Sequence, residues 1–287
     1  MTTLYRDFAT QAQLDAQYNP AIKLTDPTAP AKHYLARSSQ ARAGLRCVLD
    51  VPYGPTLMET LDIFPADAPN APVFVFIHGG YWRAFSSKEF SCVALGLQPL
   101  GITTVVVNYA LCPAVTLDEI TRQVRAAVAW TQRHIAAYGG DPARLALGGH
   151  SAGAHLTAMC LQTRWAEDYG LPADPIAAAV LVSGVYDIAP LRYSYLQPMI
   201  QLDEGIIRRN SPMFGVRPCQ TPIWVNWGSE ESPEFARQAS SFHAAWHGAG
   251  NAGELSALPG CDHYLGIHGF EDSTSRLCQW LATRLAL

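Results

Sequence analysis

Short apolar runs alternate with longer segments of helical period along most of the chain. From residue 47 onward, eight runs rich in β-branched and aromatic residues are separated by helical or loop segments. The predicted strands are 47–51, 57–64, 73–77, 103–108, 145–147, 177–182, 223–227 and 255–258. This alternation is typical of a parallel sheet with crossover helices. We therefore predict an α/β fold with a mostly parallel, eight-stranded sheet flanked by helices.

Two of these runs are apolar throughout instead of alternating with polar residues. They are 73–77 and the stretch 105–107 within 103–108. A strand with this pattern is buried on both faces of a sheet, so we predict both as central strands. Residues 90–100 and 117–135 are predicted as helices, and the second has its apolar side chains on one face. That helix should pack on the sheet.

Two stretches interrupt the alternation. Residues 1–45 are polar and contain Pro20, Pro27 and Pro30, so we expect short helices and loops that wrap the surface. Residues 186–222 form a long connection between two predicted strands, and long insertions are often lids or binding loops. An ordinary helical crossover is the alternative for this insertion. We predict one domain, residues 1–287, with an N-terminal wrap and a small lid inserted between the late strands.

Composition narrows the class of partner. The 287 residues include 20 lysines and arginines against 24 aspartates and glutamates, a formal charge of -4, which offers no broad positive field for a nucleic-acid backbone. No apolar run approaches the roughly 20 residues that cross a bilayer, and the first residues do not read as a secretory signal. Seven scattered cysteines need no disulfide framework. We expect a cytoplasmic protein that acts on a small molecule, without nucleic-acid or membrane partners, and leave a homodimer open.

The letters GHSAG at 149–153 lie between a predicted strand and a helical segment. This is the G-x-S-x-G pattern in its strand–turn–helix context. The turn needs glycines because a Cβ at either position would clash with the adjacent strand or helix. The following helix directs its N-terminal N–H groups at developing negative charge. We therefore predict Ser151 as a nucleophile, with a plain glycine-containing turn as the alternative.

The letters HGGYW at 78–82 directly follow the predicted central strand 73–77. Consecutive glycines let backbone N–H groups face an open cavity, as in an oxyanion hole. We predict that Gly79, Gly80 and Ala152 supply the N–H groups of such a hole. His78 is expected to brace the loop by hydrogen bonding instead of transferring a proton.

Candidates for an acid and a base lie late in the chain, in the order in which they follow a nucleophilic serine on this fold. Glu230 and Glu231 follow the predicted strand 223–227, and His263 follows the strand 255–258. We predict His263 as the base that takes the proton of Ser151, and Glu231 as the acid that orients it. Other candidates remain open: Glu230, Asp187 and Asp262 for the acid and His268 for the base.

The remaining histidines are not expected to bind a metal or to act as the base. His150 should point away from Ser151, and His155 lies on the following helix, so both are interpreted as structural. His243 and His247 have i, i+4 spacing on a predicted helix, 233–247, but no glutamate lies between them. We expect a solvated helix face there, and neither a metal site nor a cofactor.

Taken together, these motifs resemble the kynurenine formamidase (arylformamidase) branch of the α/β-hydrolases. The matching letters are HGGYW at 78–82, GHSAG at 149–153, SGVYD at 183–187, ESPEF at 231–235, DH at 262–263 and LDAQYN at 14–19. The resemblance implies Ser151 as nucleophile, His263 as base and Glu231 as acid. The family commonly has aspartate at the last position, so this chain departs from it by one methylene.

The resemblance implies hydrolysis of N-formylkynurenine to kynurenine and formate, and similar proteins include short-chain carboxylesterases and N-acylanthranilate-type amidases. Four aromatic residues are predicted to bind a flat aryl group beside a small acyl group: Tyr81, Trp82, Phe85 and Tyr186. The alternative is that these rings only pack the lid. A non-catalytic binding protein that kept the fold is the remaining hypothesis.

Overall fold

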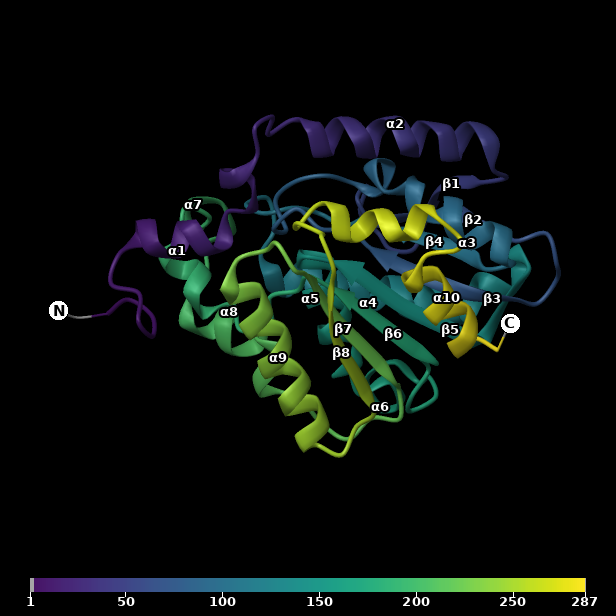
Figure 1. Ribbon diagram of the computed structural model, residues 1–287. Coiled ribbons are helices and arrows are strands. Elements are labelled where there is room, and N and C mark those ends of the chain that lie inside the picture. The colour runs from purple at the N-terminus through teal and green to yellow at the C-terminus, as the bar shows by residue number, and fades with distance from the viewer. Residues whose placement is uncertain (1–2, 287) are drawn as a thin grey trace.

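A mixed sheet of eight strands runs through the centre of the molecule (Figure 1). The computed structural model describes residues 3–286. The strand order is β1-β2-β4-β3-β5-β6-β7-β8, with β2 antiparallel to both of its neighbours and all other pairs parallel. The strands are β1 (Val48–Pro52), β2 (Thr60–Phe64), β3 (Ala71–Ile77), β4 (Thr103–Val107), β5 (Gly140–His150), β6 (Ala178–Val182), β7 (Ile223–Gly228) and β8 (Gly253–Leu258). The predicted α/β class and mostly parallel eight-stranded sheet are confirmed.

Each predicted strand overlaps an observed one, and the largest differences in length have simple causes. β5 extends well beyond the predicted 145–147, because its first half contains polar residues such as Asp141 and Arg144 that hide a strand from a hydrophobic pattern. β2 begins later than predicted, and Leu57 is 96% exposed. The central strands β3 and β4 are buried at every position, as predicted.

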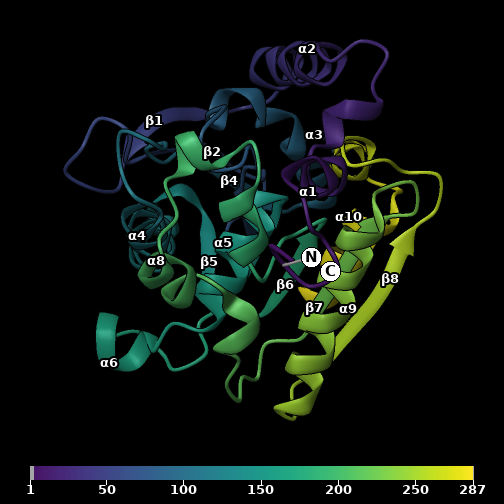
Figure 2. The ribbon, with the colours of Figure 1, turned by 90° about the vertical axis from the view of Figure 1, so that its left-hand side faces the viewer.

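Helices cover both faces of the sheet (Figure 2). Val73, Val75 and Ile77 of β3 pack into the apolar core beneath α4, α5 and α9, whereas Phe74 and Phe76 enter the opposite core with α3 and α10. The helix bounds are α3 (Ala94–Leu97), α4 (Leu117–His134), α5 (Ala152–Leu161), α6 (Trp165–Tyr169), α9 (Pro233–Gly248) and α10 (Arg276–Arg284). The predicted helix 90–100 is broken into α3 and flanking 3-10 turns, η3 (Ser91–Val93) and η4 (Gln98–Leu100).

The ends and the buried face of helix α4 follow from its local sequence. Thr116 caps its first turn by accepting the N–H of Glu119, and Asp118 and Glu119 lie where the helix dipole favours acids. Arg133 and His134 occupy the last turn, where the dipole favours cations. The apolar face predicted for this helix is buried against the sheet.

The N-terminal region forms α1 (Gln11–Tyr18), η1 (Pro20–Lys23) and α2 (Ala29–Gly44). The prediction of only short helices here is wrong, because α2 has 16 residues and lies across the top of the molecule (Figure 1). Pro30 starts this helix instead of interrupting it, since a proline in the first turn removes an N–H that has no helical partner. Glu271 of η8 (Leu265–Glu271) holds α2 in place by accepting from His33 and Arg37.

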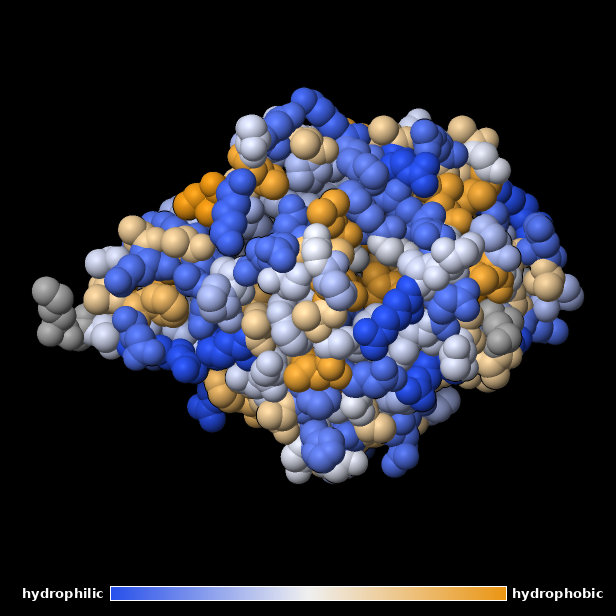
Figure 3. Space-filling model, in the orientation of Figure 1, coloured by the Kyte–Doolittle hydropathy of each residue, from blue (hydrophilic) through white to orange (hydrophobic). Residues whose placement is uncertain are grey.

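The connection 186–222 contains η6 (Ala189–Tyr193), α7 (Gln197–Ile200), α8 (Glu204–Arg209) and η7 (Pro212–Phe214). Across residues 3–286, no helix combines the length and the apolar character that a membrane crossing requires. The face drawn in Figure 3 is mostly hydrophilic, with apolar side chains in small scattered groups. All seven cysteines are free thiols.

Candidate active site

Ser151 occupies a sharp turn between β5 and α5. Its backbone has φ 58° and ψ -119°, a conformation that non-glycine residues rarely adopt. A Cβ on Gly153 would lie 1.9 Å from the carbonyl oxygen of Ile77, and one on Gly149 would lie 2.4 Å from the backbone of Gly153. Glycine is therefore required at both positions, and the turn presents the serine at the carboxyl edge of the sheet.

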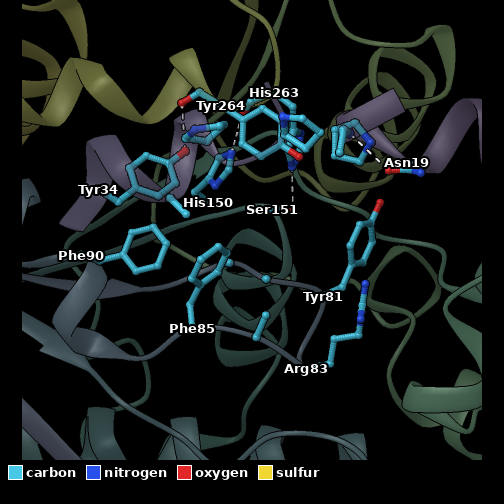
Figure 4. A pocket seen from close by; sticks show the side chains of 18 of the residues that line it. Asn19, Tyr34, Tyr81, Arg83, Phe85, Phe90, His150, Ser151, His263 and Tyr264 are labelled. Atoms are coloured by element: carbon cyan, nitrogen blue, oxygen red, sulfur yellow. Dashed lines mark hydrogen bonds between the residues drawn. The ribbon is translucent and has the colours of Figure 1, made fainter. Parts of the chain in front are cut away.

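His263 joins Ser151 to Glu231 through one hydrogen-bonded chain. Nε2 of His263 is 3.0 Å from Oγ of Ser151 (Figure 4), and its Nδ1 is hydrogen-bonded to Oε1 of Glu231. All three side chains are nearly inaccessible to solvent. A carboxylate on one imidazole nitrogen fixes the tautomer whose other nitrogen can accept a proton from the serine hydroxyl.

Glu231 is held by more than the histidine. Its Oε2 accepts hydrogen bonds from Oγ of Ser183 at 2.8 Å and from the backbone N–H of Gly228 at 2.7 Å. These two donors leave Oε1 directed at His263. Sequence analysis assigned no role to Ser183, although it directly follows β6 and so lies at the same edge of the sheet as Ser151.

None of the alternative acids and bases reaches this chain of hydrogen bonds. Glu230 is exposed, and Asp187 accepts from the hydroxyl of Tyr5. Asp262 accepts the N–H groups of the two residues that follow His263. The ring of His268 stacks on that of His33 at 3.9 Å, away from Ser151.

The glycine pair after β3 lies against the serine turn. A Cβ on Gly79 would be 2.9 Å from the carbonyl oxygen of His150, and one on Gly80, which has φ +108°, would be 2.3 Å from that of Ala84. Both glycines line the same cavity as Ser151. Within residues 3–286, the N–H groups of Gly80 and Ala152 have no backbone hydrogen-bond partner. They are free to bind an oxygen of a ligand.

His78 is enclosed by rings beneath this loop. It stacks on Tyr109 at 4.1 Å and on Phe90 at 5.6 Å, and its Nδ1 is 2.8 Å from the carbonyl oxygen of Gly79. Burial lowers the pKa of His78 to about 4. A neutral, hydrogen-bonded ring of this kind braces the loop.

His150 and His155 also have fixed hydrogen-bond partners. Nε2 of His150 is 2.7 Å from the carbonyl oxygen of His263, and Nε2 of His155 is 2.7 Å from that of Asn210. Burial, followed by the nearby His263, holds the pKa of His150 well below its usual range, and burial lowers that of His155 to about 4. His150, predicted to point away from Ser151, lines the same cavity as Ser151 and supports the backbone of His263.

A cavity of about 290 Å³ opens above Ser151 (Figure 4). Of the four aromatic residues predicted to bind substrate, Tyr81 and Phe85 line it. Trp82 and Tyr186 do not, and this part of the prediction is wrong. The ring of Trp82 turns inward against His155, and that of Tyr186 stacks on Phe242 at 4.3 Å in the core.

A large part of the cavity wall comes from the N-terminal region. The connection 186–222, predicted as the lid, contributes Tyr195 alone to this cavity, whereas residues 19–34 contribute seven of its lining residues. Two hydrogen bonds tie the end of α1 to the site: Tyr81 donates to the carbonyl of Tyr18 at 2.5 Å, and Ser232 donates to that of Gln17 at 2.6 Å. The lining residues to which sequence analysis assigned no role in the site are Asn19, Pro20, Ala21, Pro27, Pro30, Ala31, Tyr34, Arg83, Ala84, Phe90, Tyr195 and Tyr264.

A group with the right side chains for a metal lies outside the cavity. His33, His268 and Glu271 place their ligand atoms within 4.8 Å of one another. However, both oxygens of Glu271 already accept hydrogen bonds, and one of the donors is the cationic Arg37. These side chains are therefore explained as hydrogen bonds that hold α2 against η8.

Known proteins with similar sequences and structures point to one family. Residues 74–216 match the family model for the alpha/beta hydrolase fold. A kynurenine formamidase from Danio rerio is 31% identical over 96% of this chain and 94% of its own length, and the esterase LipQ from Mycobacterium tuberculosis is 29% identical over 86% of this chain and 62% of its own. A crystal structure from Silicibacter sp., provisionally assigned as a thioesterase, superposes with a TM-score of 0.81 at 25% identity, covering 94% of this chain and 97% of that one. The chain is therefore a hydrolase and belongs to the kynurenine formamidase-like branch of the α/β-hydrolase family.

Proposed function

We propose that this hydrolase removes a formyl or other short acyl group from an aryl amide such as N-formylkynurenine, through an acyl-enzyme on Ser151. The observation that carries the proposal is the 3.0 Å contact between Nε2 of His263 and the hydroxyl of Ser151, with Glu231 on the other ring nitrogen. Two relatives named kynurenine formamidase, from Danio rerio and Salmo salar, support the choice of substrate.

In the first half-reaction, Oγ of Ser151 attacks the carbonyl carbon while His263 takes the hydroxyl proton at Nε2. The negative charge moves to the carbonyl oxygen, where the N–H groups of Gly79, Gly80 and Ala152 stabilise it; each donor of this kind is worth roughly 100- to 1,000-fold in rate. Collapse breaks the carbon–nitrogen bond, and His263 returns its proton to the departing arylamine. The acyl group remains as an ester of Ser151.

In the second half-reaction, His263 takes a proton from water, and the resulting hydroxide attacks the acyl ester. His263 returns that proton to Oγ of Ser151, and formic acid or a short carboxylic acid leaves and loses its own proton to solvent, giving formate or the carboxylate. Glu231 stays ionised and stabilises the imidazolium in both halves. Ser183 and Gly228 keep its carboxylate oriented.

The cavity wall favours an aryl leaving group. Tyr34, Tyr81, Phe85 and Tyr264 present rings around the opening above Ser151 (Figure 4). The volume of about 290 Å³ is close to the lower end, roughly 300 Å³, of pockets that bind small molecules. Such a site suits one ring with a small acyl group better than a long acyl chain.

A second function, short-chain carboxylesterase, is favoured by the similarity to the esterase LipQ. An N-acylanthranilate-type amidase would use the same residues. An ester is intrinsically easier to cleave than an amide, so ester turnover alone does not separate these functions.

The test compares kcat/KM on N-formylkynurenine, an N-acylanthranilate and p-nitrophenyl acetate. We expect the formamide to be preferred, and a large preference for the simple ester would overturn the formamidase proposal in favour of a carboxylesterase. Labelling with a fluorophosphonate should give an adduct on Ser151 that the Ser151→Ala variant lacks. Absence of this adduct in the wild type would contradict the covalent mechanism.

A further inference from the structure

The cavity above Ser151 contains one side chain with a permanent charge. Its lining comprises aromatic, small and amide side chains, two histidines and Arg83, without lysine, aspartate or glutamate among the described residues. Glu231 lies behind His263 and is engaged by it. The electrostatic field inside the cavity is therefore biased toward an anionic ligand group.

Arg83 reaches this cavity from the loop that carries the glycine pair. Its backbone N–H donates to the carbonyl of Gly80 at 3.1 Å, and its guanidinium carbon lies 5.8 Å from the centre of the Tyr195 ring. Figure 4 shows the side chain extending beside Tyr81 toward Asn19. The loop conformation, with positive φ at Tyr81 and Trp82, directs this arginine into the cavity while Trp82 turns into the core.

Within residues 3–286, no carboxylate lies within 4.0 Å of the Arg83 guanidinium. The acid on the neighbouring element, Asp15, instead accepts the backbone N–H of Tyr195 at 2.8 Å. By contrast, Arg237, which is also partly buried, is paired with Glu234. Arg83 thus faces the cavity with Tyr195 beside it and no carboxylate partner in the part of the chain that the structure describes, and its fork of N–H donors has the geometry that suits a carboxylate.

We propose that Arg83 binds a carboxylate of the substrate, so that the preferred substrates are acyl arylamines, or aryl esters, that carry a carboxylate outside the scissile acyl group. This inference rests on the proposed acyl transfer at Ser151. A formyl or short acyl group is too small to carry a carboxylate of its own. The carboxylate that Arg83 binds must therefore belong to the leaving group. The ring of Tyr195 beneath the guanidinium stabilises the same orientation by a cation–π contact.

The test uses two substrate pairs that differ only in this charge. One pair is N-formylkynurenine and its carboxamide, and the other is 4-acetoxybenzoate and its methyl ester. A half-buried charge-assisted contact should lower KM for the acid of each pair by about tenfold relative to the neutral partner, and the preference should shrink as salt is added. In Arg83→Gln the preference for the acid over its neutral partner should disappear. Arg83→Lys should retain part of it, because a single ammonium replaces the bidentate fork.

Arg208→Gln, which removes an exposed arginine remote from the cavity, is the matched control and should keep the full preference. Equilibrium binding of kynurenine and its carboxamide to the Ser151→Ala variant supplies a readout that does not depend on turnover. If neither formamide is hydrolysed but both esters are, the formamidase function fails while the ester pair and the binding data still test Arg83. Retention of the acid preference in Arg83→Gln, or an equal loss on acid and neutral substrates, would overturn the inference.

Discussion

The two walls of the cavity are built in different ways. The serine wall is the turn from β5 into α5 together with His263, which contacts Ser151. In this turn, any Cβ on Gly149 or Gly153 would collide with backbone atoms of the turn itself or of Ile77 in β3. The N-terminal wall, residues 19–34, is held by contacts between distant parts of the chain. Examples are Tyr34 with the carbonyl of Tyr264 at 3.1 Å and Tyr81 with that of Tyr18.

This difference separates the chemistry from the choice of substrate. The serine wall carries the reacting groups and tolerates almost no change, because its backbone is strained and closely packed. The N-terminal wall lines the cavity away from the reacting groups, so its side chains can change without moving Ser151 or His263. Relatives named formamidase and esterase can thus share one reaction centre and differ in what they accept.

Substitutions of the reacting groups in the serine wall should have the largest effect on kcat. Ser151→Ala and His263→Ala should each lower kcat on the preferred substrate by on the order of 10^5- to 10^6-fold, and the double variant should lose little more, because the two residues act as a unit. Initial-rate measurements on the three purified proteins test this. Ser39→Ala, at an exposed serine on α2, is the control and should keep wild-type activity. Additive losses in the double variant would contradict the shared role.

Of two adjacent glutamates, only Glu231 should act as the acid of the catalytic site. Glu231→Ala should lower kcat by roughly 10^3- to 10^4-fold, since the histidine loses the group that fixes its tautomer and stabilises its charged form. Glu230→Ala should leave kcat within about twofold, because that side chain is exposed and does not reach His263. The two variants are compared in the same assay, and a larger loss for Glu230→Ala would reverse the assignment.

These two walls also explain what the sequence could predict. The sheet, the serine turn and the late acid and histidine follow from short-range patterns: apolar strands, glycines beside Ser151, and polar residues directly after strands β7 and β8. The pairing of Glu231 with His263 is a hydrogen bond between distant loops, yet the parallel sheet brings the ends of those strands together and makes it predictable.

The N-terminal wall could not be predicted in this way. Its polar composition indicates only that it lies on the surface of the protein. Nothing in residues 19–34 specifies which part of the molecule they cover. The contacts that decide it, such as Tyr34 with Tyr264, join elements far apart in sequence. The direction of Trp82 could not be predicted either, because adjacent residues in a loop with positive φ point to opposite sides. That of Tyr186 depends on its contact with Phe242, which lies far away in sequence.

Buried histidines should give the serine wall a distinct pH dependence. His155 on α5 is fully buried and has its pKa lowered to about 4, whereas an unfolded histidine titrates near 6.5. The unfolded chain therefore binds more protons between these values, so the free energy of unfolding should fall as pH drops from about 6.5 to about 4, by up to about 3 kcal/mol for this residue. Above pH 6.5 its contribution should be constant.

Denaturant unfolding of the wild type and His155→Gln at several pH values between 4 and 7 measures this effect. The variant should be less stable at pH 7, because it loses native packing, but its stability should depend less steeply on pH. His247→Gln, at an exposed histidine, should keep the wild-type slope. Equal slopes in wild type and His155→Gln would show that this histidine does not titrate on unfolding.

Loosening the N-terminal wall should give the smallest effect, confined to that wall. Glu271→Gln removes the charge that holds His33 and Arg37 against η8, at a partly exposed site where such a pair is worth about 1 kcal/mol. Hydrogen exchange of the α2 amides should therefore accelerate by roughly fivefold, while the amides of α5 exchange as in the wild type. Asp168→Asn, which breaks the exposed pair with Arg164 on α6, should leave hydrogen exchange in α2 unchanged.

The same Glu271→Gln variant should affect substrate binding but not the reaction itself. Because the serine wall is fixed by its own backbone, kcat on p-nitrophenyl acetate should be retained while KM for the aryl formamide rises. Faster hydrogen exchange in α5 as well would show instead that the two walls unfold together, so that a change in the N-terminal wall also changes the reacting groups.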